Sequence, residues 1–119
     1  MSNAVTIFES NQLPEFLSKR QVIFVYIDGD KVNDKLSFFQ EVALKMCFPS
    51  YFGFNWDAFR DCITDLSWLT IQDGLVLVYK NPNKFMGSHS EQWNIANEIL
   101  LKSITFWNSR DIPMFIMYI

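Results

Sequence analysis

Three runs of apolar, largely β-branched and aromatic residues are the feature of this sequence that most constrains its fold. They read QVIFVYI at residues 21–27, GLVLVY at 74–79 and MFIMYI at 114–119. Each run is too continuously apolar for a strand with one solvated face, so we expect both faces of each strand to be covered. Segments with helical periodicity separate the runs, and this order, with right-handed crossovers, predicts an α/β fold with a small parallel sheet.

Three segments between these runs have apolar residues at helical spacing. The first begins near Asp34, a candidate N-cap, and the second extends over about residues 55–66, with Asn55 as its candidate cap. The third opens at Ser88, which has the spacing of a capping box with Glu91. The inward residues predicted for the three helices are, in turn, Leu36, Phe39, Val42, Ala43 and Met46; Trp56, Phe59, Cys62, Ile63 and Leu66; and Trp93, Ala96, Leu100, Ile104 and Trp107.

Length and composition favour one folded domain. Half of the 119 residues are hydrophobic and 17% are aromatic, which excludes an intrinsically disordered chain. The net charge is −3 and the ten basic residues form no run, which argues against direct binding of nucleic acid. No apolar run approaches the roughly 20 residues needed to span a bilayer, and no signal peptide is recognisable, so we expect a soluble cytoplasmic protein that does not bind membranes.

The first twenty residues lie outside the alternating pattern. We therefore predict a domain over residues 21–119 and an N-terminal extension over residues 1–20 whose structure the pattern does not define. Within the extension, residues 5–20 have the composition of a short strand followed by a helical turn after Pro14. The sequence Ser-Asn-Ala at residues 2–4 resembles a cloning remnant and is given no weight.

Groups that carry catalysis are scarce in this sequence. It has a single histidine, His89, in a predicted loop where a surface or capping role is expected, and it has no GxSxG, CxxC or glycine-rich phosphate motif. Asp28 and Asp30 flank a glycine in a predicted turn, where aspartates are common. Cys47 and Cys62 are expected to be reduced and mostly buried. We therefore expect no enzymatic activity, no metal site and no cofactor.

The second predicted helix has an acidic side. On a helical wheel, Asp57, Asp61 and Thr64 fall within roughly 60° of one another, opposite the apolar side, and Arg60 and Asp65 flank them. Like charges four residues apart on a helix cost about 0.2–0.5 kcal/mol per pair, so folding alone does not favour this arrangement. One interpretation is a solvated face on which Arg60 pairs with Asp57, and the other is a surface that binds a partner.

The loop before this helix favours the second interpretation. Tyr51, Phe52, Phe54 and Trp56 cannot all point into a small core from a loop that turns at Gly53, so at least one, Tyr51 first, is expected to be exposed. An exposed tyrosine beside aspartates that become desolvated on binding is typical of interface hot spots. Such a surface suits a protein with a concave, positively charged site, and ribonuclease active sites have this character because they bind phosphates.

The stretch FPSYFGFNWDAFRDCITDL, residues 48–66, resembles the PxYYGxNxDAxxDxLT signature of the barstar family, intracellular protein inhibitors of barnase-type ribonucleases. The resemblance extends from about Val22 to the C-terminus and implies a three-stranded parallel sheet packed with helices, whose second helix and preceding loop plug a nuclease active site. It implies that Asp61 mimics a substrate phosphate. The residues expected to bind the partner are Tyr51, Gly53, Asn55, Asp57, Arg60, Asp61 and Thr64.

This copy of the signature departs from the family's pattern in three places. Arg60 replaces an aromatic contact residue, Phe54 replaces an acidic one, and a late-helix glutamate has no clear match in SITFWN, residues 103–108. Because barstar-like chains also occur as immunity proteins for toxin nucleases, the resemblance implies an inhibitor of a barnase-like or other toxin ribonuclease, monomeric when free. The alternative is a non-enzymatic interaction module of the same fold that binds a protein other than a nuclease.

Overall fold

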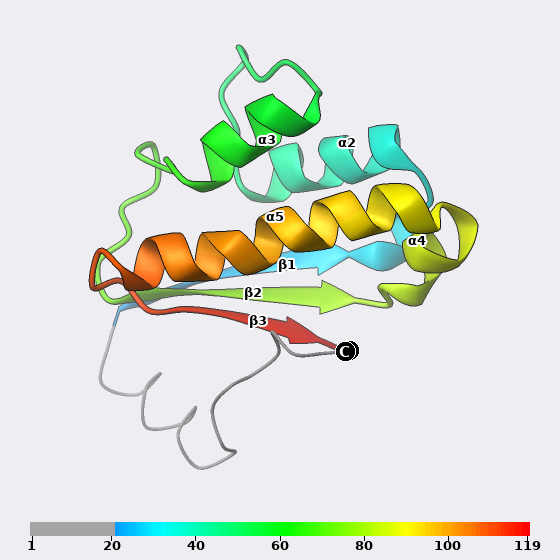
Figure 1. The fold of residues 1–119 in the computed structure, drawn as a ribbon. Helices are drawn as coiled ribbons and strands as arrows, with labels where there is room; N and C mark the ends of the chain where they lie inside the picture. The colour runs from blue at the N-terminus through cyan, green and yellow to red at the C-terminus, as the bar shows by residue number, and fades with distance from the viewer. Residues whose placement is uncertain (1–20) are drawn as a thin grey trace.

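The three apolar runs form one parallel sheet. The computed structural model describes residues 21–119. Its strands are β1 (Val22–Asp28), β2 (Gly74–Lys80) and β3 (Met114–Tyr118). They lie in the order β1-β2-β3, and the register places Val25 beside Leu77 and Leu77 beside Ile116 (Figure 1). The predicted α/β fold with a three-stranded parallel sheet is confirmed.

The long helices lie together on one face of this sheet (Figure 1). The helical elements are η1 (Gly29–Lys31), α2 (Lys35–Lys45), α3 (Trp56–Ile63), α4 (Asn83–Ser88) and α5 (Ser90–Asn108). The chain crosses from β1 to β2 through α2 and α3, and from β2 to β3 through α4 and α5. Because both crossovers advance across the sheet in the same direction, right-handed connections place their helices on the same side.

The expectation of strands covered on both faces is wrong for β1, whereas the central strand β2 is buried on both faces at Leu75, Val76 and Leu77. Val25 and Ile27 of β1 are buried on the helical side, whereas Phe24 and Tyr26 between them keep 54% and 45% of their surface exposed. Successive side chains of a strand point to opposite faces, and no helix of the described residues lies on the second face. β1 therefore alternates in burial although its sequence is apolar throughout.

α2 begins as predicted, and of its predicted inward residues Phe39, Val42 and Met46 are buried and Ala43 packs against the core. Asp34 is its N-cap, and its carboxylate accepts a hydrogen bond from the Ser37 amide at 2.8 Å while the Ser37 hydroxyl accepts one from the Asp34 amide. Phe38 is fully buried and packs against aromatic rings of α3 and α4. Leu36, two residues away and thus on the opposite side of the helix, is exposed, so its predicted place in the core is wrong.

The predicted start of the last helix is also wrong in detail. The capping box of Ser88 and Glu91 does not form, because Ser88 is the last residue of α4, a short helix that the periodicity did not predict. The Ser88 hydroxyl donates instead to the carbonyl of Asn33, at 2.7 Å. α5 starts after His89, which is exposed, makes no side-chain cap and has its Nδ1 atom 2.7 Å from the same carbonyl.

The inward side of α5 agrees with the prediction. Trp93, Ala96, Leu100 and Trp107 are buried, and Ile104 packs against the core while partly exposed. The indole of Trp107 donates a hydrogen bond at 2.8 Å to a carbonyl at the end of α3. α5 thus spans the sheet and fixes the position of α3 above it.

The two cysteines are free, as predicted, but they differ in exposure. Cys62 is buried on the inner side of α3, whereas Cys47 is exposed, so the prediction that both are mostly buried is wrong for Cys47. Cys47 follows the end of α2 with a left-handed backbone, φ 57°, and this turn directs the chain away from the helix.

The predicted N-terminal extension, including its short strand and helical turn, lies outside the described residues. Within residues 21–119, none of the helices combines the length and apolar character that a bilayer crossing requires.

Candidate functional site

The loop between α2 and α3 is anchored by two of its aromatic rings and exposes another. Phe52 is buried, and its ring centroid lies 5.0 Å from that of Phe48 and 5.6 Å from that of Phe39 on α2. Tyr51, the neighbouring residue, keeps 72% of its surface exposed, as the sequence predicts. The core therefore holds the loop in place while the tyrosine ring faces solvent.

The turn into α3 depends on Phe54 and Asn55. The sequence predicts a turn at Gly53, but the left-handed residue is Phe54, with φ 53°. Asn55 is the predicted N-cap, and its carbonyl oxygen accepts a hydrogen bond from the Ala58 amide at 2.8 Å. Its amide nitrogen donates to the Gly53 carbonyl at 3.2 Å, so one side chain fixes both the loop and the first turn of the helix.

The inner side of α3 is held by packing and by two indole hydrogen bonds. Phe59, Cys62 and Ile63 are buried, and Trp56 is partly buried. The Trp56 indole donates to Gln92 of α5 at 3.0 Å. Because α3 has only eight residues, these contacts with the core, rather than intrinsic helix stability, keep it formed.

The outer side of α3 presents the predicted acidic residues to solvent. Asp57 and Asp61 are exposed, and Arg60 lies 2.9 Å from Asp57, which is the ion pair that the alternative interpretation predicts. The helix ends at Ile63 instead of extending to residue 66, so Asp65 lies beyond it. Within residues 21–119, the Asp61 carboxylate has no hydrogen-bond or ion-pair partner.

Thr64 is less available than the sequence implies. It is the C-cap of α3, is half-buried, and its hydroxyl donates to the Arg60 carbonyl at 2.7 Å. Its hydroxyl proton is therefore used within the helix, and only its oxygen lone pairs remain for a further contact.

Burial and charge keep Cys62 unreactive. Burial raises the pKa of its thiol, and the carboxylates of Asp65 and Asp61 raise this pKa further. A raised pKa keeps the sulfur protonated at neutral pH, and the thiol rather than the thiolate is a poor nucleophile. The position therefore serves packing, and no group of three or more potential metal ligands accompanies it in the part of the chain that the structure describes.

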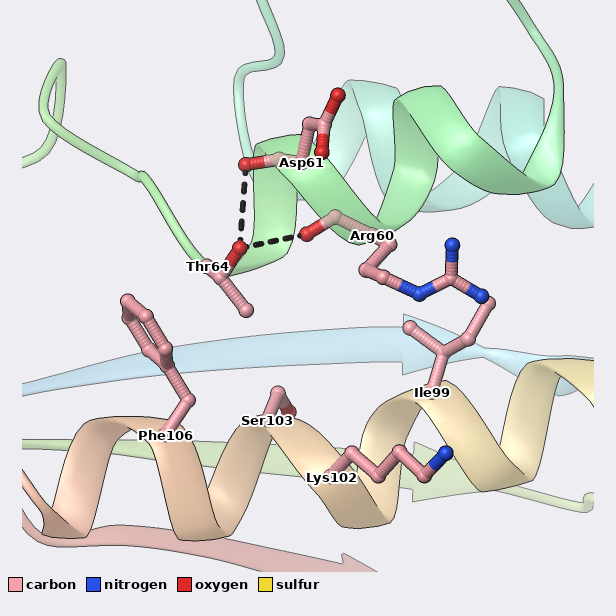
Figure 2. Close-up of a pocket in the computed structure, with 7 residues that line it drawn as sticks. All are labelled: Arg60, Asp61, Thr64, Ile99, Lys102, Ser103 and Phe106. Atoms are coloured by element: carbon pink, nitrogen blue, oxygen red, sulfur yellow. Dashed lines mark hydrogen bonds between the residues drawn. The ribbon is translucent and has the colours of Figure 1, made fainter.

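A groove of about 310 Å³ lies between α3 and α5, beside Asp61 (Figure 2). Its lining comprises Arg60, Asp61, Thr64, Ile99, Lys102, Ser103 and Phe106. In Figure 2 the charged ends of Arg60 and Lys102 lie near Ile99 at one end of the groove, and Phe106 lies at the other. Lys102 forms an exposed ion pair with Glu98 at 3.2 Å, so both cations have a carboxylate partner that water also solvates.

Sequence reasoning missed the half of this groove that α5 contributes. Residues of α3 and α5 that lie about forty positions apart meet only because α5 crosses the sheet beneath α3, and no local pattern encodes that crossing. One signal was available in the sequence. A late-helix glutamate of the barstar family has no match in residues 103–108, and Ser103 and Phe106 of this segment line the groove.

Comparison with known proteins identifies one family. The family model described as Barstar (barnase inhibitor) matches residues 22–119, which is nearly the whole of the described chain. No curated protein matches the chain.

Proposed function

The chain belongs to the barstar family, and we propose that it is a protein inhibitor of a barnase-like or other toxin ribonuclease. In this proposal α3 and the loop before it block the basic active site of the nuclease by contact, and the chain performs no catalysis. The observation that carries the proposal is the exposed Asp61, which has no side-chain partner within residues 21–119, on a helix entered through the exposed Tyr51. We also propose that the free inhibitor is a cytoplasmic monomer.

Each residue of the proposed site has a distinct role. Asp61 takes the place of a substrate phosphate, and Asp57 adds negative charge one turn earlier, which speeds encounter with a basic partner. Tyr51 provides a rigid ring with a polar tip, which suits the centre of an interface. Gly53 and Asn55 act indirectly, because the hydrogen bond between them holds the loop in its binding conformation.

The remaining two residues of the proposed site, Arg60 and Thr64, lie on its groove side. Arg60 is bound to Asp57 by an exposed ion pair, which is worth little in water and is easily exchanged for a contact with a partner. Thr64 retains acceptor capacity after donating to the helix. These residues form the edge at which this inhibitor would distinguish one nuclease from another.

The test is an RNA-cleavage assay in which the chain is titrated against barnase and against any small basic nuclease encoded beside its gene. We expect stoichiometric protection of RNA by at least one of them, and a loss of binding by about 2–5 kcal/mol in Asp61→Ala, the range typical for removal of one partner of a desolvated charge pair and drawn partly from the barnase–barstar complex. Glu91→Ala, an exposed acidic position on α5, is the matched control and retains full inhibition. Undiminished inhibition by Asp61→Ala would refute the assigned site.

The cationic end of the groove favours one second candidate function. Arg60 and Lys102 lie together there, and they would oppose a partner that is uniformly basic (Figure 2). A barstar-like interaction module that binds a protein other than a nuclease accommodates this feature more readily. Failure to protect RNA from either nuclease in the same assay would favour this candidate over the inhibitor.

A further inference from the structure

The groove between α3 and α5 combines mainly apolar walls with basic residues at both ends. Ile99 is almost fully buried at one end, and the Phe106 ring forms the other end (Figure 2). The charged groups of Arg60 and Lys102 lie near Ile99. The Arg110 guanidinium lies 3.8 Å from the centroid of the Phe106 ring, which adds a cation at the opposite end. Three cations thus surround an apolar groove, although the net charge of the chain is −3.

Two of these cations can exchange their present partners for another anion. Arg60 pairs with Asp57 at 2.9 Å and Lys102 pairs with Glu98 at 3.2 Å, and all four side chains are more than half exposed. Exposed ion pairs of this kind contribute little to stability. The Asp61 carboxylate points away from α5, so it does not fill the groove (Figure 2). The groove therefore offers positive charge beside apolar surface to a molecule that docks there.

The size of the groove fits one large side chain. Its volume is about 310 Å³, and an apolar cavity of about 150 Å³ already accommodates a benzene molecule. A leucine, a methionine or an aromatic side chain therefore fits, with room for part of the adjoining backbone. Packing against Ile99 and Phe106 removes apolar surface of both molecules from water, which favours binding.

A partner that covers Asp61 also reaches this groove. The eight residues of α3 make a helix about 12 Å long. A standard interface buries about 800 Å² on each partner, which corresponds to a patch roughly 30 Å across. Asp61 itself lines the groove, so a partner seated on α3 extends over α5 and covers Arg60 and Lys102. Because a cation that is buried without a counter-charge destabilises a complex, the partner needs an anion at this position.

We propose that the inhibited nuclease inserts one large apolar side chain into the groove and pairs a neighbouring carboxylate with Arg60 and Lys102. This inference rests on the proposed function, and it specifies a nuclease with an acidic edge beside its basic active site. Asp57 and Asp61 then face the basic site, while the two cations face the acidic edge. Complementary charges of both signs fix the orientation of the complex and disfavour a nuclease whose edge is basic.

Lys102→Glu tests the charge of this edge through the sign of its effect on the Kd for whichever nuclease the wild-type chain inhibits. Added negative charge generally favours encounter with a basic protein. The matched control Lys31→Glu, at an exposed residue of η1 that does not line the groove, should therefore leave the Kd unchanged or lower it. Lys102→Glu should instead raise the Kd about tenfold or more, because it brings like charges together. An unchanged or lowered Kd for Lys102→Glu would overturn the proposal.

Substitutions in the nuclease identify the carboxylate that binds the two cations. Each acidic residue outside the nuclease active site is replaced in turn by lysine, and the Kd is measured with the wild-type chain and with Lys102→Glu. One replacement should weaken binding of the wild-type chain and restore binding of Lys102→Glu, which is the coupling that a direct contact produces. If no replacement restores binding, the proposed carboxylate contact is wrong.

Phe106→Ala tests the apolar part of the contact. We expect the Kd to rise about tenfold, whereas the matched control Phe24→Ala, at an exposed ring of β1, leaves it unchanged. Unfolding in urea shows that both variants are folded under the conditions of the assay. An unchanged Kd for Phe106→Ala would mean that no side chain enters the groove. Light scattering covers the rival occupant, because a free chain that dimerises and that Phe106→Ala makes monomeric would place a second copy in the groove and contradict the proposal.

Failure of this inference can be told apart from failure of the proposed function. If the wild-type chain protects RNA from no nuclease, the proposed function fails and this inference fails with it. If the wild-type chain, Lys102→Glu and Phe106→Ala inhibit a nuclease equally well, the proposed function stands and only the groove contact is refuted.

Discussion

α2 and α3 are neighbouring amphipathic helices whose polar sides serve different purposes. On α2 the polar groups bind the protein itself: Glu41 is only 4% exposed and accepts hydrogen bonds from the Asp28 amide at 2.8 Å and from Lys45 at 2.7 Å. On α3 the Asp61 carboxylate has no such partner within residues 21–119, and the ion pair of Asp57 is fully at the surface. The polar side chains of α2 thus bind other groups of the fold, whereas the carboxylates of α3 remain available for a partner.

Periodicity alone does not reveal this difference. Both helices have an N-cap and an apolar stripe, and both were predicted from the same pattern. What separates them is the environment of the polar side, which depends on segments distant in the sequence. Substitutions in the two helices should therefore affect stability and binding in different proportions.

Phe59→Ala has the largest expected effect on stability, because it removes a buried ring from the inner side of α3, the helix whose outer side we propose as the binding surface. Phe59 is fully buried, and its ring contacts that of Phe38 with centroids 5.2 Å apart. We expect a loss of about 3–5 kcal/mol in the free energy of unfolding in urea, from lost burial and the cavity left behind. Asp61→Ala on the same helix is the control and changes stability little. A loss below about 1 kcal/mol in Phe59→Ala would show that α3 is not anchored as described.

Asp34→Ala has an intermediate effect and removes a polar group that α2 uses for folding. We expect a loss of about 1 kcal/mol, the usual contribution of an N-cap. Hydrogen bonds from the amide and from the hydroxyl of Ser37 to the carboxylate lower the pKa of Asp34 below its ordinary value of 3.8. A lowered pKa in the folded state means that this stabilisation is present above pH 3.8 and is lost as the pH falls through the folded pKa.

Unfolding measured in urea across the acidic range checks both parts of this expectation. The wild-type chain and Asp34→Ala should differ most near neutral pH and converge in acid, where the capping carboxylate is protonated. Asp57→Ala is a suitable comparison, since its carboxylate is at the surface of α3. If the difference in free energy of unfolding between wild type and Asp34→Ala stays constant as the pH falls below the folded pKa of Asp34, the charge of the capping carboxylate does not contribute to stability.

The sequence predicts the parts of this molecule that depend on local chemistry. Asp34 and Asn55 were identifiable as caps because short polar side chains before an apolar periodic segment satisfy free amides. The exposure of Tyr51 followed from crowding in a short loop. Gly29 was predicted to form a turn, yet the structure gives a different reason for it, because a Cβ there would lie 1.8 Å from the carbonyl oxygen of Lys80.

The sequence did not predict what depends on distant segments. The burial of Glu41 requires the backbone of β1, and the groove beside Asp61 requires α5 to cross beneath α3. Leu36 and Phe38 are equally apolar, and only the position of the neighbouring rings decides which of them is buried. The placement of the helices on one side of the sheet has the same origin, because continuous apolar strands do not specify on which side the crossovers run.

Asp61→Asn has the smallest expected effect on stability and so tests whether α3 keeps this charge for a reason other than folding. Asp57 and Asp61 are four residues apart in α3, and relief of their repulsion is worth about 0.2–0.5 kcal/mol. Asp65 adds little, because the helix ends before it. We therefore expect unfolding in urea to show unchanged or slightly raised stability, whereas binding to an inhibited nuclease falls. Lys102→Gln, across the groove, is the control for the effect of a lost surface charge on stability. A clear loss of stability in Asp61→Asn would mean that the carboxylate serves the fold, and the contrast between α2 and α3 would then fail.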